Sequence, residues 1–330
     1  MIGGKGLHII ASAPGKVILF GEHFVVKNRP AIAVALELRL RVTVSDSNEY
    51  IVIISKNTGG KLVIDPTNLT VKEDYRGPSQ LLAVLKELKN MVNGLKPAYI
   101  SIESEIPVAA GLGSSASLAV AFTAAYSRYL GLNLSREEIS RIAYEAERIV
   151  HGKPSGIDNT IASLGGAILY HKNSTRRINI SKLDEVAIVI ADTGIERSTR
   201  EAVLSVLSLY DKHPRVMEKI YEAAEEIIRE AEESLSKGDW IRVGELMNIN
   251  HGLLSAIGVS ILELEELVYL ARKSGALGAK ITGAGMGGSI IALTLRENVE
   301  QVVEALRREA KRVISTGISE EGVVVREKNC

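Results

Sequence analysis

The sequence predicts an α+β protein of two domains, with a β-rich first half and a helix-rich second half. Three observations support this prediction. The chain has 330 residues, which suits about two domains of ~100–200 residues each. Alternating and β-branched runs fill the N-terminal third, whereas segments with helical periodicity fill most of the second half. We place the domain boundary near residue 175, so that the domains span residues 1–175 and 176–330.

The expected strands are short β-branched or alternating runs separated by turns. Pro14-Gly15, Lys27–Pro30 and Gly59-Gly60 are turn signals that divide the strands of the N-terminal third. We expect strands at residues 7–13, 16–20, 31–36, 39–45, 50–55, 98–103, 165–171, 185–191, 279–282, 289–294 and 322–326.

The expected helices have apolar residues at helical spacing with charged residues between them. The helix at 135–151 begins with Ser135-Arg136-Glu137-Glu138, a capping box whose hydroxyl and carboxylate satisfy free backbone N–H groups. We expect the others at residues 79–91, 114–130, 196–210, 215–237, 239–251, 260–273 and 297–314, and a polar connection at 173–177.

The composition excludes several classes of protein. Lys and Arg number 40, Asp and Glu number 40, and 46% of residues are hydrophobic, enough for a core in each domain. Zero net charge argues against a general nucleic-acid binder, because neutralising phosphates needs a surplus of lysine and arginine. Cys330 is the single cysteine, so we expect neither an internal disulfide nor a thiolate metal cage.

The sequence also predicts a soluble, cytoplasmic protein. The first residues lack the long apolar stretch of a signal peptide. The longest uncharged run, residues 106–127, contains Pro107 and several glycines and serines. Only residues 116–126 of this run are expected to be helical, which is too short to span a membrane.

The most informative segment is Pro107–Ser117, which follows a strand and opens a helix. Its glycines let the backbone approach a bulky anion, and the free N–H groups and dipole of the following helix favour negative charge. Ser114, Ser115 and Ser117 add hydroxyls that can bond phosphate oxygens or a metal. The segment is therefore either a phosphate cradle or a plain glycine-rich turn with a serine N-cap.

Other nucleotide-binding motifs fit less well. No segment has the Walker A pattern of two glycines followed by Lys and Ser or Thr. Residues 111–116 have the glycine spacing of a Rossmann fingerprint, but the next helix runs into another helix. Residues 283–288 have the same spacing but precede a strand. We therefore expect no nicotinamide or flavin.

Charged residues stand at both ends of an apolar strand near the N-terminus. Lys16 begins this strand, and Glu22 and His23 follow it. Lys16 is either a solvated strand end or a buried cation that faces an anionic substrate. Charge at both ends of a buried strand favours a site.

Three further features have two interpretations each. Asp158 follows a Pro154-Ser155-Gly156 turn and either caps a helix or accepts a hydroxyl proton. Glu147 is either an exposed helix carboxylate or a ligand of Mg²⁺, which needs only one or two carboxylates beside nucleotide phosphates. Residues 280–289 carry four glycines and form either a hairpin or a second wall of an anion pocket.

Taken together, these segments resemble the motifs of the GHMP small-molecule kinases. Pro107–Ser117 is similar to the family's phosphate-binding motif, Lys280–Ser289 to its C-terminal glycine motif, and Pro14–His23 to its N-terminal motif. Their order, their spacing and the total length agree, so the resemblance covers essentially the whole chain. Met286 departs from the pattern, because related kinases often carry a further glycine there.

Within the family, the pattern is most similar to the mevalonate kinase branch. Galactokinase has arginine at the position of Lys16, and homoserine kinase lacks the aspartate that matches Asp158. The resemblance implies an N-terminal α/β ATP-binding domain with a left-handed βαβ unit and a C-terminal ferredoxin-like domain. ATP and substrate would lie in the cleft between them.

The resemblance also implies an activity, which is ATP- and Mg²⁺-dependent phosphorylation of the 5-hydroxyl of mevalonate in isoprenoid biosynthesis. Asp158 would accept the hydroxyl proton, and Lys16 would keep Asp158 ionised and steady the transferring group. Ser115 and Glu147 would hold Mg²⁺. The residues expected to bind the substrate are Glu22, His23, Arg197 and Thr199. Those expected to bind ATP are Pro107, Val108, Ala109, Ala110, Gly111, Leu112, Gly113, Ser114, Ser115, Ala116 and Ser117.

Two alternatives remain at this point. One is a kinase of the same family that acts on another small hydroxylated substrate, such as phosphomevalonate or a sugar. The other is a nucleotide-binding regulator without catalysis, although such proteins typically lose the base or the lysine. Homodimers are common among the enzymes that the chain resembles, and the sequence alone does not give the oligomeric state.

Overall fold

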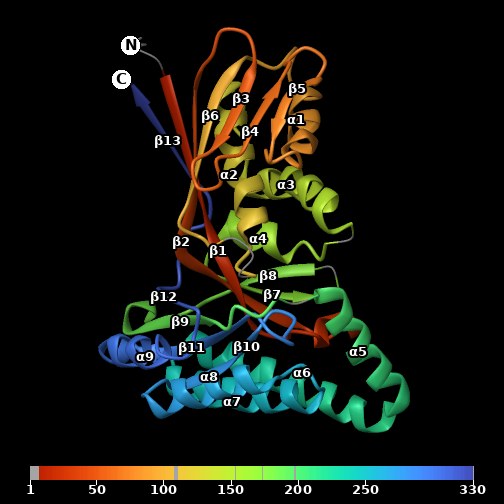
Figure 1. Ribbon diagram of the computed structural model, residues 1–330, viewed down its shortest axis with the longest axis vertical. Coiled ribbons are helices and arrows are strands. Elements are labelled where there is room, and N and C mark those ends of the chain that lie inside the picture. The colour runs from red at the N-terminus through yellow and green to blue at the C-terminus, as the bar shows by residue number, and fades with distance from the viewer. Residues whose placement is uncertain (1–6, 108–110, 153, 173, 197, 330) are drawn as a thin grey trace.

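The computed structural model describes residues 7–107, 111–152, 154–172, 174–196 and 198–329. Two β-sheets, each covered by helices, lie one above the other in Figure 1, and the long strands β1 and β2 reach from the first toward the second. This arrangement places the end of β1 and the loop after it at the junction of the two halves.

The first sheet has the strand order β13-β1-β2-β6-β3-β4-β5, with β7 paired to β2 and β8 paired to β7. Most of its pairs are antiparallel, and β3 and β6 are parallel. The bounds of its strands are β1 (Leu7–Phe20), β2 (Ala31–Asp46), β3 (Ile51–Ser55), β4 (Lys61–Ile64), β5 (Val71–Tyr75), β6 (Ala98–Ser104), β7 (Ala167–His171), β8 (Ser174–Ile178) and β13 (Val324–Asn329).

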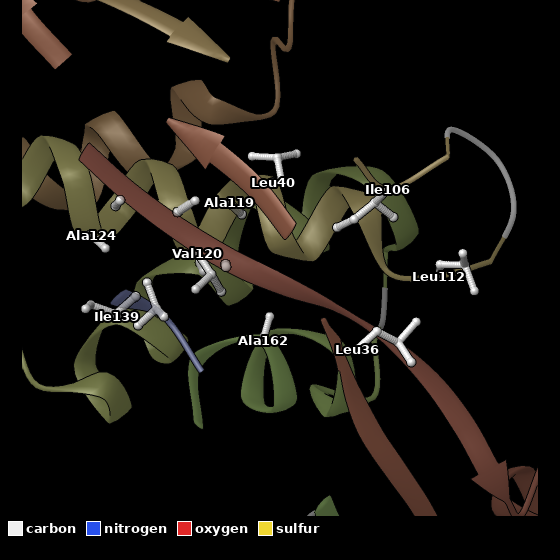
Figure 2. Packing of buried hydrophobic residues seen from close by; sticks show 14 of the residues in the cluster. Leu36, Leu40, Ile106, Leu112, Ala119, Val120, Ala124, Ile139 and Ala162 are labelled. Atoms are coloured by element: carbon white, nitrogen blue, oxygen red, sulfur yellow. The ribbon is translucent and has the colours of Figure 1, made fainter. Parts of the chain in front are cut away.

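Four helices cover this sheet: α1 (Leu81–Lys89), α2 (Ser114–Tyr129), α3 (Arg136–His151) and α4 (Ile157–Leu164). α2 lies directly on β1 and β2 and is buried on nearly all sides, as its many alanines allow. Figure 2 shows Ala119, Val120 and Ala124 of α2 beside these strands, within the main hydrophobic core. The capping box predicted at the start of α3 is confirmed.

The second sheet is antiparallel, with the order β10-β11-β9-β12. Its strands are β9 (Val186–Asp192), β10 (Gly278–Thr282), β11 (Ser289–Leu295) and β12 (Arg312–Thr316). The helices α5 (Thr199–Lys212), α6 (Pro214–Lys237), α7 (Trp240–Ala256) and α8 (Leu262–Lys273) connect β9 to β10, and α9 (Val299–Leu306) lies between β11 and β12. This βαββαβ order confirms the expected ferredoxin-like domain. The handedness of the βαβ unit in the first domain stays a prediction.

The two halves are interlocked. β8 belongs to the first sheet and β9 to the second, so the chain passes between them after Ile178, while β13 returns to pair with β1. Phe24, in the short 3₁₀ helix η1 (Phe24–Lys27), is buried in the core of the second half, with its ring 5.0 Å from that of Tyr221. The boundary near residue 175 stays a prediction.

Several predicted elements differ from the structure. Pro14-Gly15 does not end a strand, because β1 continues through it with an irregular register. The helix predicted at 297–314 is wrong in its second half, since α9 ends at Leu306 and β12 pairs with β9. The polar connection predicted at 173–177 is also wrong: β8 pairs with β7 through its backbone, which tolerates polar side chains.

Among the helices of the described ranges, none combines the length and the apolar character needed to cross a membrane.

Candidate active site

A cavity of about 480 Å³ lies where the two halves meet. Its walls come from the end of β1 and the following loop, from residues 111–116, and from α3, α4, α5 and the loop after β10. Most of the residues expected from the sequence to be functional line it. Those that the sequence predicts for catalysis, metal binding or substrate binding are Lys16, Glu22, His23, Ser115, Glu147, Asp158 and Thr199.

The glycine-rich loop is fixed against β1. The backbone N–H of Lys16 donates to Leu112 O at 2.9 Å. Ile106 and Leu112, which flank the loop, are both buried in the core (Figure 2). Gly113 is the N-cap of α2 with φ of 74°, and a Cβ there would lie 2.8 Å from Cγ of Lys16. The loop therefore presents the first turn of α2 to the cavity, and only glycine fits beside the Lys16 stem.

Lys16 and Asp158 form an ion pair, with Nζ 3.0 Å from Oδ1. The Lys16 side chain is 10% exposed and that of Asp158 is 33% exposed. Lys16 is thus a buried cation that faces the cavity, not a solvated strand end. Asp158 lies in the first turn of α4, whose N-cap is Gly156, so the interpretation of Asp158 as the helix cap is wrong.

Ser115 of α2 and Glu147 of α3 bring together two oxygen atoms that can bind a metal ion. The Ser115 hydroxyl donates to Glu147 Oε1 at 2.6 Å, and Glu147 is only 2% exposed, so the interpretation of Glu147 as an exposed carboxylate is wrong. Within the described ranges, no cluster of three or more His, Cys, Asp or Glu residues could hold a metal by itself. One carboxylate and one hydroxyl suit Mg²⁺ that takes its remaining ligands from phosphates and water, so the donor set fits this ion.

The hydrogen bond of His23 defines which tautomer its ring adopts. Its ring nitrogen Nε2 lies 2.8 Å from Ala284 O, and as a carbonyl oxygen can only accept, Nε2 carries the proton. Burial lowers the pKa of His23, so the ring is neutral at neutral pH. Nδ1 is buried and has no hydrogen-bond partner within the part of the chain that the structure describes, which leaves it able to accept a hydrogen bond.

Some expected site residues are not brought to the cavity. Ser117 is buried, and its hydroxyl donates to Pro14 O at 2.6 Å instead of facing the cavity. Its role in binding ATP stays a prediction, as do the other assigned roles. The expected residues Val108, Ala109, Ala110 and Arg197 lie outside the described residues.

Sequence reasoning missed two features of this site. Ile18, Val25, Val26 and Val203 line the cavity, and no sequence signal distinguishes these apolar residues from core residues. Lys280 forms a buried ion pair with Glu22. The signal for Lys280 was its position inside the apolar strand 279–282, where a charge needs a partner.

The comparisons with known proteins agree with this fold. Residues 79–167 match the GHMP kinases N terminal domain, and residues 231–312 match the GHMP kinases C terminal domain. The chain belongs to the GHMP kinase family.

Relatives that are 40–43% identical to the chain include mevalonate kinases. The mevalonate kinase of Aeropyrum pernix is 43% identical over 317 residues, which cover 96% of this chain and 98% of the relative. That of Pyrococcus furiosus is 41% identical and covers 97% of this chain and 99% of the relative. The crystal structure of L. major mevalonate kinase in complex with R-mevalonate is 32% identical, with a TM-score of 0.80 over 94% of this chain and 96% of that one.

Proposed function

We propose that the protein is a mevalonate kinase that transfers the γ-phosphoryl group of ATP to the 5-hydroxyl of mevalonate. The observation that carries this proposal is the Lys16–Asp158 pair, 3.0 Å apart in a cavity that also receives the first turn of α2. The relatives at 40–43% identity over nearly their full length support mevalonate as the acceptor.

The phosphates of ATP would lie against residues 111–116. Backbone N–H groups at the start of α2 have no partner within the helix, and they donate to phosphate oxygens where the helix dipole favours negative charge. Ser115 and Glu147 would hold Mg²⁺ beside these phosphates, and the bound ion neutralises charge on the β- and γ-phosphates.

Asp158 and Lys16 act on the reacting hydroxyl. Asp158 accepts the proton of the 5-hydroxyl as the oxygen attacks phosphorus, and the exposed third of its side chain leaves room for that contact. Lys16 holds Asp158 in place and stabilises negative charge on the transferring group. Phosphoryl transfer depends mainly on positioning and charge stabilisation, and both residues are positioned by secondary structure, β1 and α4.

The remaining groups of the cavity bind the rest of the acceptor. Nδ1 of neutral His23 can accept a hydrogen bond from a hydroxyl, and Glu22 and Thr199 add further polar contacts. Ile18, Val25 and Val203 supply an apolar wall, which suits a branched hydrocarbon acid better than a sugar.

The test is ADP release with ATP, Mg²⁺ and one acceptor at a time: mevalonate, phosphomevalonate, homoserine or galactose. We expect release with (R)-mevalonate far above the rate without acceptor, and a product whose ³¹P NMR signal is that of 5-phosphomevalonate. Preference for another acceptor would identify a different kinase of the family. Nucleotide binding without release on any acceptor would identify a regulator.

We further propose that the protein acts in the cytoplasm, as its composition with the single Cys330 suggests. The homodimer expected from the resemblance is checked by size-exclusion chromatography with light scattering.

A further inference from the structure

A buried ion pair joins the two halves of the protein at the cavity. Glu22 lies in the loop after β1, and Lys280 lies in the middle of β10. Lys280 Nζ donates to Glu22 Oε1 and also to Ile281 O at 2.7 Å. The Lys280 side chain is 0% exposed and that of Glu22 is 2% exposed, so both charges are fully removed from bulk water.

Desolvation offsets much of what this ion pair contributes to the stability of the fold. Desolvating two charges costs several kcal/mol, and well-packed apolar residues of similar volume are often as stabilising or more so. Burial raises the pKa of Glu22, opposed by the charges of Lys280 and Lys16, and burial lowers the pKa of Lys280. The ion pair beside the cavity therefore has a large desolvation cost, and one oxygen of its carboxylate has no hydrogen-bond partner among the described residues.

That oxygen is Glu22 Oε2, which is buried and has no hydrogen-bond partner among the described residues. Glu22 lines the cavity, whereas Lys280 does not. Lys280 binds the other oxygen, Oε1, and so restrains the Glu22 carboxylate before any ligand arrives. A buried acceptor without a partner is costly, and a hydroxyl donor in the cavity relieves this cost.

We propose that Lys280 is a positioning residue that fixes Glu22 across the domain junction, so that Glu22 Oε2 accepts a hydrogen bond from a hydroxyl of the acceptor substrate. Lys280 touches no substrate and acts through Glu22 alone. The inference rests on the proposed function, because it assigns the acceptor side of the same cavity.

The test is a double-mutant cycle with the variants Lys280→Met, Glu22→Gln and Glu22→Gln/Lys280→Met. Loss of a hydrogen bond to a charged group predicts that Lys280→Met raises the KM for mevalonate about 10- to 100-fold, with the KM for ATP within about twofold. In the Glu22→Gln background, Lys280→Met should change the KM for mevalonate by less than about twofold, because the carboxylate through which it acts is gone.

Arg29→Met is the matched control. Arg29 also pairs across the two halves, with Glu225 at 2.8 Å and with Glu218, but it does not line the cavity. Its removal should lower the melting temperature and leave both KM values near those of the wild type. A purely structural role of Lys280 would give Lys280→Met this same behaviour.

Three results would overturn the inference. One is an unchanged KM for mevalonate in folded Lys280→Met, and another is the same rise in KM with and without Glu22. The third applies if Lys280→Met fails to fold, because Glu22→Gln is then compared with the double variant. A higher KM for mevalonate in the double variant than in Glu22→Gln would refute the inference. An inactive wild type would instead refute the proposed function.

Discussion

Replacing Lys16 by methionine separates a catalytic role from a structural one. Methionine keeps the unbranched stem that packs against Gly113 and removes only the ammonium group. The substitution removes the buried charge itself and leaves Asp158, which is 33% exposed and stays solvated, so the cost to stability is close to that of an exposed pair, about 0–1 kcal/mol. We therefore expect the melting temperature to fall by no more than about 4 °C.

Turnover should respond far more strongly. Removing one preorganised group that stabilises charge in the transition state typically lowers kcat by about 10²–10³, or roughly 2.7–4 kcal/mol. ATP affinity should change little, because the N–H groups of the loop at residues 111–116 remain. Lys16→Arg should rescue poorly, since the planar guanidinium does not replace a compact ammonium beside Gly113.

The assay is steady-state ADP release with mevalonate, combined with thermal unfolding of each variant. Lys61→Met is the matched control, because Lys61 forms a 2.7 Å ion pair with Glu73 in an exposed part of the first sheet. It should keep wild-type turnover. Near-normal turnover in Lys16→Met would refute the catalytic role. Lost turnover together with a collapsed melting transition would make Lys16 structural.

Four other substitutions test further parts of the structure. Ser115→Ala and Glu147→Gln should raise the Mg²⁺ and ATP concentrations needed for half-maximal rate while leaving mevalonate affinity unchanged, and an effect on mevalonate alone would contradict the metal role. Burial lowers the pKa of His251 in the folded protein below its value in the unfolded chain. As the pH falls below about 6.5, this histidine therefore binds a proton in the unfolded chain before it does so in the folded protein, and the free energy of unfolding decreases. In thermal melts between pH 7.5 and 5, His251→Gln should lose less stability than the wild type, and an equal loss would contradict this cause. Met286 has φ of 56°, so Met286→Gly relieves backbone strain in the folded state but also gives the unfolded chain more conformational freedom. We expect wild-type turnover and, in thermal unfolding, a stability change within about 1 kcal/mol. Lost turnover would show that the methionine does more than fill the turn.

The sequence predicts the parts of the site that depend on local chemistry. A strand, glycines, serines and a helix are expected one after another in residues 98–130, and backbone physics alone favours an anion site there over a plain glycine-rich turn. The pairing of Lys16 with Asp158 came from the resemblance, because neither residue carries a local signal of the other. The structure places them 3.0 Å apart.

Tertiary pairings escape sequence reasoning for the same reason. Lys280 was visible as a lysine inside an apolar strand, but nothing nearby in the sequence indicates that its partner is Glu22. β12 was missed because Arg312–Thr316 continues the charged and apolar spacing of the preceding helix. Its β-branched Val313 and Ile314 pair with β9, a contact that only the fold provides.

The substitution Asp158→Asn tests the central claim most directly, namely that phosphoryl transfer occurs at the Lys16–Asp158 pair. Asparagine keeps the size of the side chain and removes the charge that accepts the hydroxyl proton. The measurement is turnover with saturating mevalonate, alongside ATP affinity from titration with a fluorescent nucleotide. We expect turnover to fall about 10²–10⁴-fold with ATP affinity within about twofold of the wild type. A variant that retains more than about a third of wild-type turnover would contradict the claim, because a group that takes the proton in the transition state cannot be removed at so small a cost.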